Sequence, residues 1–138
     1  MVELMSDPYR LKIYILENMQ HLGTDAGQMH LSFRTPIWHP PTDVFETDTT
    51  VTVRCEIAGM AEADFAIQLD GRYLTVRGSR PDVAERRAYH QMEIMFGEFS
   101  VELELPCPVD AENAQAVYHN GFLRITMPKV LPKQVPIE

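Results

Sequence analysis

Ala114-Gln-Ala-Val-Tyr-His-Asn-Gly-Phe-Leu-Arg-Ile-Thr-Met127 contains two strand-like runs that flank a short turn. Residues 114–118 and 122–127 have the composition and length of a strand pair. Asn120 and Gly121, in the turn between them, are residue types that favour positive φ angles. The stretch therefore predicts a hairpin with a tight turn.

Between Trp38 and this hairpin, several runs alternate apolar and polar residues with a period of two. Val51, Val53 and Cys55 alternate with Thr52 and Arg54, as the residues of a half-buried strand do. The further strands that this pattern predicts lie at 50–57, 65–69, 73–77, 89–95 and 99–105. Roughly seven or eight short strands, with no helices between them, predict an all-β fold, an antiparallel immunoglobulin-like β-sandwich.

The N-terminal residues follow a different period. Asp7 and Pro8 form a helix-start signal and Gly23 a stop, and apolar residues between them recur at three- and four-residue spacing. A helical arm over about residues 8–22 is therefore predicted. The chain divides into an N-terminal arm with its linker (1–37), a domain (38–129) and an extended C-terminal tail (130–138), in which prolines prevent a further strand.

The composition excludes several classes of partner. The formal net charge of −8 argues against nucleic acid and against anionic membrane surfaces, because both attract basic patches. No apolar run approaches the length of a membrane span, and the N-terminal residues lack a signal-peptide pattern. Cys55 and Cys107 are expected to be reduced thiols of a cytoplasmic protein, with a disulfide as the alternative.

We find no sequence motif for catalysis or cofactor binding. There is no glycine-rich phosphate loop and no nucleophile elbow. The histidines are not paired at metal-ligand spacing, and Glu98, Glu102 and Glu104 alternate along the polar side of a strand, as solvated charges do. We therefore expect no catalytic residue, no metal and no cofactor. An enzyme with a pocket that joins His90 or His119 to carboxylates is the alternative.

Residues 116–123, Ala-Val-Tyr-His-Asn-Gly-Phe-Leu, resemble the Ala-x-x-x-Asn-Gly-Val-Leu signature of the small heat-shock proteins. Three more segments match that family in the same order: the entry segment 38–46, the turn 57–60 and the strand 97–106. The region from about 38 to 129 is thus similar to the α-crystallin domain of the bacterial and plant-like members. The signature residues are Ala116, Asn120, Gly121 and Leu123.

The resemblance implies an assembly tail and a groove that receives it. Val135-Pro136-Ile137 resembles the Ile-x-Ile motif with which members assemble, and its two β-branched residues point the same way from an extended backbone. The implied groove lies between strands 65–69 and 114–118. Its residues are Phe65, Ile67, Leu69, Ala114, Ala116 and Tyr118. A frayed end with incidental apolar residues is the alternative for the tail.

The resemblance also implies a dimer built by strand exchange, in which residues 87–90 pair beside the strand 43–46 of a second copy. Strand character returns at Tyr89, after a polar loop, where an edge strand would need a partner. Val101 replaces an arginine that many members carry at the dimer interface, so we expect backbone pairing rather than ion pairs to hold the dimer. The exchange residues are Asp43, Val44, Phe45, Arg87, Tyr89 and His90. Direct pairing of the 99–105 strands is the alternative.

The implied function is that of an ATP-independent molecular chaperone, which holds unfolding proteins and prevents their aggregation. Such a protein is not an enzyme, and its partners are further copies of itself, as dimers and higher homo-oligomers, and unfolding clients. The client-binding residues of the arm would be Leu11, Ile15, Leu16, Met19, Leu22 and Phe33. An ordinary packed helix and a membrane-surface helix are the alternatives for the arm. The rival family is that of CS-domain co-chaperones, which are adaptors with a similar sandwich and are expected to be monomeric.

Overall fold

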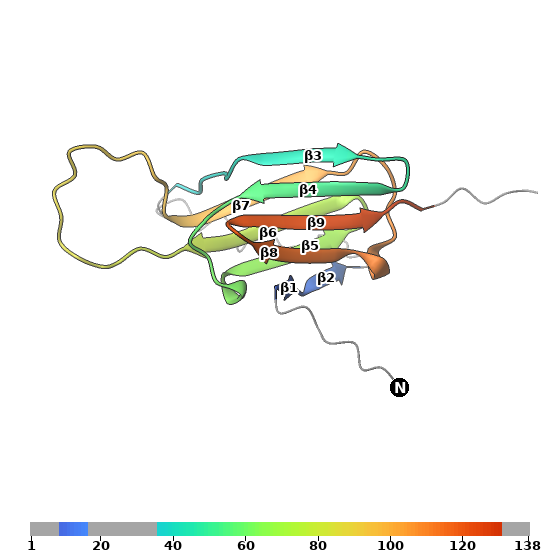
Figure 1. Cartoon of the computed structure of the whole chain (residues 1–138), viewed down its shortest axis with the longest axis horizontal. Helices are drawn as coiled ribbons and strands as arrows, with labels where there is room; N and C mark the ends of the chain where they lie inside the picture. The colour runs from blue at the N-terminus through green and yellow to red at the C-terminus, as the bar shows by residue number, and fades with distance from the viewer. Residues whose placement is uncertain (1–8, 17–35, 131–138) are drawn as a thin grey trace, which may run out of the picture.

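The computed structural model describes residues 9–16 and 36–130, and these residues fold into two packed β-sheets (Figure 1). The five-stranded sheet consists, in spatial order, of β1 (Arg10–Leu11), β8 (Gln115–His119), β9 (Phe122–Pro128), β4 (Thr50–Glu56) and β3 (Thr42–Glu46). The four-stranded sheet consists of β2 (Ile13–Leu16), β5 (Phe65–Asp70), β6 (Tyr73–Arg80) and β7 (Gly97–Glu104). Short 3-10 helices, η2 (Glu62–Asp64) and η3 (Ala111–Asn113), lie before β5 and β8. The predicted all-β sandwich is confirmed.

The core between the sheets is formed by alternate residues of the long strands. Along β4 and β9 three apolar pairs lie in register and are at most 1% exposed: Val51 with Met127, Val53 with Ile125 and Cys55 with Leu123. In the other sheet, Ile67 and Leu69 of β5 lie opposite Val76 and Leu74 of β6, and all four are buried. Each such side chain stabilises the fold by about 1.5–3 kcal/mol relative to an exposed one. The period of two in the sequence thus marks the buried face of each strand.

The tight turn predicted between β8 and β9 is confirmed. Asn120 and Gly121 have φ angles of 52° and 80°, in the left-handed region that these residue types tolerate. The Ile57 N–H donates a hydrogen bond to the Gly121 carbonyl oxygen at 2.8 Å. This bond attaches the turn to the segment that follows β4, so the conformation of the signature residues fixes how the hairpin meets the rest of the sheet.

The described part of the N-terminal segment corrects the prediction of a helix over residues 8–22. Residues 10–11 and 13–16 are strands: β1 pairs antiparallel with β8, and β2 pairs parallel with β5. The exposed edges of β8 and β5 offer backbone hydrogen-bond partners, and this pairing outweighs a helical spacing of apolar residues. Residues 17–22 lie outside the described residues. Because β2 and β5 are parallel, the four-stranded sheet is mixed rather than purely antiparallel as predicted.

The prediction of a strand at 89–95 is also wrong for the single chain. Residues 81–96, here called the long loop, contain no strand and link β6 to β7. The long loop projects beyond the end of both sheets (Figure 1). An alternating sequence forms a strand only where a neighbouring strand lies within hydrogen-bonding reach, and the described part of this chain provides none at that place.

Candidate functional site: two sheet edges and the long loop

The residues predicted to receive the tail lie together at one side of the sandwich, on β5 and on or just before β8. The buried members of this set are Ile67, Leu69, Ala114 and Ala116. Phe65 and Tyr118 are half-buried, and their rings pack against each other with 5.0 Å between centroids. The apolar side chains of β5 and β8, two strands of different sheets, therefore form one continuous apolar region. We call this surface the β5–β8 groove.

Tyr118 is held in a defined position at the end of the groove. Its hydroxyl group donates a hydrogen bond to the Ile57 carbonyl oxygen at 2.7 Å and accepts one from the Met60 N–H at 3.3 Å. Both partners lie in the turn that follows β4. Since a buried hydroxyl is stabilised only when its hydrogen bonds are made, these contacts fix the ring that packs against Phe65.

The described N-terminal residues cover the β5–β8 groove. Leu11 lies opposite Ala116 of β8, and Ile13 lies opposite Ile67 of β5. Leu11 is only 9% exposed and belongs to the core, while Ile13 is half-buried against it. The Tyr118 N–H donates a hydrogen bond to the Tyr9 carbonyl oxygen at 2.9 Å, which extends the pairing by one residue. Two regions to which the sequence assigned separate roles are therefore in contact.

The client-binding residues predicted for the arm fall into two groups. Leu11 is buried in the core, whereas Ile15 is 40% exposed and Leu16 is half-buried at the outer side of β2. Tyr14, which was not in the predicted set, is exposed beside them. The remaining members, Met19, Leu22 and Phe33, lie outside the described residues.

The predicted exchange partner, β3, lies at the end of the five-stranded sheet and pairs with β4 only. Val44 and Phe45 are exposed on it. Asp43 forms an ion pair with Arg54 at 2.5 Å, and the Arg54 guanidinium also lies 5.3 Å from the centre of the Phe45 ring. On its outer side, β3 thus offers an unpaired strand edge within the described residues, flanked by apolar side chains.

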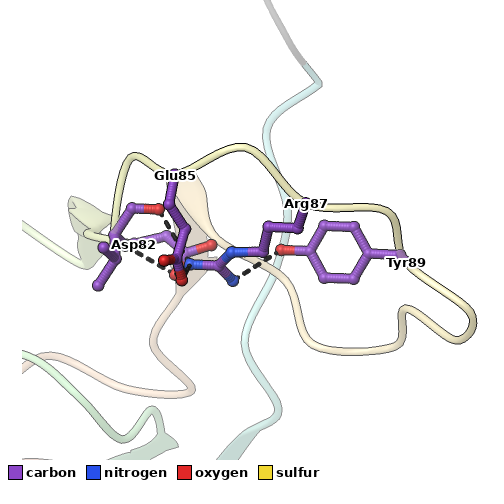
Figure 2. A network of polar contacts seen from close by, with 5 residues as sticks. Asp82, Glu85, Arg87 and Tyr89 are labelled. Carbon is purple, nitrogen blue, oxygen red and sulfur yellow. Dashed lines mark hydrogen bonds and ion pairs between the residues drawn. The ribbon is translucent and has the colours of Figure 1, made fainter.

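Within the long loop, Arg87 organises a local network of polar contacts (Figure 2). Its guanidinium forms ion pairs with Asp82 at 3.4 Å and Glu85 at 3.1 Å, and it donates hydrogen bonds to the Tyr89 hydroxyl and the Val83 carbonyl oxygen, both at 3.0 Å. These groups are partly exposed, where an ion pair contributes at most about 1 kcal/mol. The predicted exchange residues Arg87 and Tyr89 therefore contact each other within the loop and are not brought to β3 of the same chain.

The long loop also exposes apolar side chains that the prediction did not include. Every residue from 81 to 96 is exposed, among them Met92 at 64% and Ile94 at 63%. His90 is exposed as well, between Tyr89 and this apolar pair. The sequence signal for this segment was the alternation over residues 89–95. The exposed apolar residues Met92 and Ile94 lie within that stretch, but after the predicted exchange residues Arg87–His90.

Arg80 anchors the base of the long loop, a role that the sequence did not reveal. Its guanidinium donates hydrogen bonds to the Met95 carbonyl oxygen, with the Nε contact at 2.9 Å, and to the Ala58 carbonyl oxygen at 3.3 Å. It also stacks on the rings of Trp38 and Phe96, at 4.5 and 5.2 Å from their centres. Because Arg80 ends β6 and Met95 precedes β7, one side chain joins the two ends of the loop.

The histidines and carboxylates do not form a metal cluster among the described residues. His39 Nδ1 lies 2.5 Å from the Ser100 carbonyl oxygen, and the His119 ring packs edge-on against Tyr9 at 4.4 Å. One surface hollow on the five-stranded sheet is lined by His119, Asp43 and Glu56, but β9 and β4 separate the strand of His119 from that of Asp43, and Asp43 is ion-paired with Arg54. These side chains make contacts that explain their positions without a substrate.

Both cysteines are free thiols. Burial raises the pKa of the Cys55 thiol, although a hydrogen bond from the Thr42 hydroxyl acts in the opposite direction. Cys107 is half-buried. Among the residues that the structure describes, no helix is long and apolar enough to cross a membrane.

Comparisons with known proteins place this arrangement in a family. The model of the Hsp20/alpha crystallin family matches residues 43–138. Small heat shock protein C2 of Rickettsia felis is 33% identical over 92 residues, which cover 65% of this chain and 60% of that protein. Heat shock protein 16 of Schizosaccharomyces pombe is 32% identical over 99 residues and 69% of either chain. The chain thus spans about three fifths to two thirds of the length of these relatives.

A solved structure gives the same result for the fold. Heat shock protein 16.0 from Schizosaccharomyces pombe superposes with a TM-score of 0.61 at 30% sequence identity. The match covers 72% of this chain and 98% of that one. The two-sheet arrangement is therefore shared over nearly the whole of the solved relative.

Proposed function

The chain belongs to the Hsp20/alpha crystallin family, and from this membership we propose that it is an ATP-independent molecular chaperone and not an enzyme. It binds unfolding proteins and prevents their aggregation. The observation that carries the proposal is apolar surface exposed on a sandwich whose core is already complete. In the single chain, the exposed apolar side chains include Tyr14 and Ile15 on β2, Val44 and Phe45 on β3, and Met92 and Ile94 in the long loop.

Such a surface suits clients that have no common sequence. Burial of apolar area contributes about 25 cal/mol per Å² and has no directional requirement, so any exposed apolar segment of a client can contribute. Met92 and Met95 have flexible thioether side chains that adapt to irregular apolar surfaces. No hydrolysis is needed for capture, because the free energy of burial drives binding by itself.

The dimer forms, in this proposal, by exchange of the long loop between two copies. The segment Arg87–His90 pairs beside β3 of the second copy, at the start of the stretch 89–95 that forms no strand in the single chain. Support comes from the unpaired side of β3 and from the exposed apolar residues of the loop. Val101, at the position of the family's arginine, is 7% exposed and faces the core opposite Val76, which favours an interface held by backbone pairing.

Higher homo-oligomers form when the tail of one copy binds the β5–β8 groove of another. The connecting residues are Val135, Pro136 and Ile137, which lie outside the described residues. The groove supports this role because its strands present a row of apolar residues between two sheet edges. We further propose that the protein acts in the cytoplasm, where its two free thiols stay reduced, and that its net charge of −8 keeps it from nucleic acid.

Aggregation of an unrelated enzyme tests the chaperone function. The purified full chain, mixed at near-stoichiometric amounts with a heat-labile enzyme, should suppress light scattering on heating in the absence of ATP and of metal. Serum albumin at the same mass concentration is the control for nonspecific crowding. Strict dependence on ATP, or scattering equal to the albumin control, would overturn the proposal.

The CS-domain adaptor remains the alternative function and predicts a different particle. An adaptor should be monomeric, whereas the proposed chaperone should form dimers and larger assemblies. Multi-angle light scattering of the full chain separates the two at low micromolar concentration. A monomer mass near the 15.8 kDa of one chain would favour the adaptor.

A further inference from the structure

The β5–β8 groove is occupied by the chain's own N-terminal residues, and this occupation points to a competition. We propose that residues 9–16 and the tail motif Val135-Pro136-Ile137 of a second copy bind the same groove and exclude each other. The inference rests on the proposed function, in which the tail is the connector. It adds that assembly must displace an internal segment, which is then released for contact with clients.

The first argument is the match between the two segments. Leu11 and Ile13 stand two residues apart, and both enter the apolar surface, Leu11 opposite Ala116 and Ile13 opposite Ile67. Val135 and Ile137 have the same spacing. The groove therefore already contains a pair of apolar side chains of the kind that the tail would insert.

The second argument concerns the residue in the middle of each segment. Lys12 lies between β1 and β2 and belongs to neither strand, because at this residue the chain leaves β8 and begins to pair with β5. The corresponding residue of the tail is Pro136. Proline has no N–H to donate, so a position outside both ladders is one where it is tolerated.

The third argument is that both edges are in use. The strands β1 and β2 take up the backbone groups of β8 and β5 that a tail would need, and the Tyr118 N–H is bound to the Tyr9 carbonyl oxygen at 2.9 Å. A tail strand and the N-terminal strands cannot pair with these edges together. Occupation of the groove by one segment must therefore end before the other can bind.

The fourth argument is that the N-terminal pairing is weak enough to be displaced. The strands β1 and β2 have two and four residues, against seven in β4 and in β9. Only Leu11 is buried, while Tyr14 and Ile15 remain exposed. A segment held by one buried side chain and a few ladder bonds competes chiefly through its high effective concentration as part of the same chain.

Binding of a tail peptide to the full chain tests the competition. The parent is the full chain with Val135→Ser and Ile137→Ser, so that its own tail cannot compete. The open variant adds Leu11→Ser and Ile13→Ser. The locked variant instead adds Arg10→Cys and Val117→Cys, which lie directly opposite in register, a separation that a disulfide can span. The probe is a fluorescent peptide of residues 130–138, and its anisotropy gives the dissociation constant.

The open variant should bind the peptide at least about tenfold more tightly than the parent, the effect of removing roughly one buried apolar side chain from the competitor. The oxidised locked variant should bind about tenfold more weakly and should recover on reduction. The parent protein, oxidised and reduced in the same way, is the control for any effect of oxidation at Cys55 and Cys107. Equal affinity for parent, open and locked protein would overturn the competition and leave the tail-binding groove intact. No binding to any of them would overturn the groove as well.

The locked variant keeps the test decisive if the open variant loses its fold, since it removes no core side chain. Far-ultraviolet circular dichroism of each variant, compared with the parent, identifies such a loss. A peptide in which the two apolar residues are serine should bind none of the proteins. Binding of that peptide would show contacts that do not depend on the motif, and would count against the competition.

Discussion

Replacing Gly78 by alanine adds one methyl group to β6, and we expect it to destabilise the sandwich. Gly78 lies opposite Phe65 of β5 and Phe99 of β7. A Cβ atom here would lie 2.6 and 2.8 Å from two atoms of the Phe99 ring, and closer still to the Asp64 carbonyl oxygen. Real Cβ contacts essentially never fall below 3.0 Å, so the ring and the backbone must both move.

The expected loss follows from how tightly the Phe99 ring is held. Phe99 is 2% exposed, and its ring packs against Trp38 and Phe65 at 5.6 and 6.1 Å between centroids. Overpacking of such a site costs about 1–3 kcal/mol, while alanine in place of glycine recovers about 0.4–1 kcal/mol by restricting the unfolded chain. Because the added Cβ would also meet a backbone atom, the Asp64 carbonyl oxygen, the overpacking cost should lie in the upper half of that range, about 2–3 kcal/mol. The net decrease in the free energy of unfolding should therefore be about 1–2.6 kcal/mol.

Urea denaturation followed by tryptophan fluorescence measures this loss. Trp38 is the single tryptophan of the chain, it is buried, and it lies against Phe99, so its emission reports on the affected part of the core. Ser79→Ala is the matched control, because Ser79 is the next residue of β6 and is exposed, and it should change stability by less than about 0.5 kcal/mol. A Gly78→Ala protein as stable as this control would refute the argument that the ring has no room to move.

Further predictions concern assembly and the thiols. Val135→Ser with Ile137→Ser should reduce the particle to dimers in light scattering, because each side chain contributes up to about 1.5–3 kcal/mol of burial per docking event; an unchanged mass would show that another segment connects the dimers. Deletion of residues 82–90 should yield monomers whose circular dichroism still shows a sandwich, and a deletion protein that stays dimeric at low micromolar concentration would favour pairing through β7. Maleimide at neutral pH should modify Cys107 well before Cys55, since burial raises the pKa of the Cys55 thiol and hides it; equal rates by mass spectrometry would contradict this.

The sequence determined which residues of the sandwich face inward. Alternation along 50–57 and 122–127 reports a property of each strand by itself, namely that one side is buried, and the buried pairs Val51–Met127 and Val53–Ile125 follow from it. The turn at Asn120 and Gly121 was equally predictable, because positive φ angles are a local steric preference.

Only the tertiary structure decided what happens at the edges of the sheets. Alternation does not determine which strand a segment pairs with. The alternating residues 89–95 therefore predicted a strand, although in the single chain this segment has no neighbouring strand and lies in the long loop. The spacing of Leu11, Ile15 and Leu16 suited a helix, yet residues 10–11 and 13–16 form strands because they pair with the edges of β8 and β5. Pairing partners are set by which segments meet in space, and that depends on the closure of the whole sandwich rather than on any short run of residues.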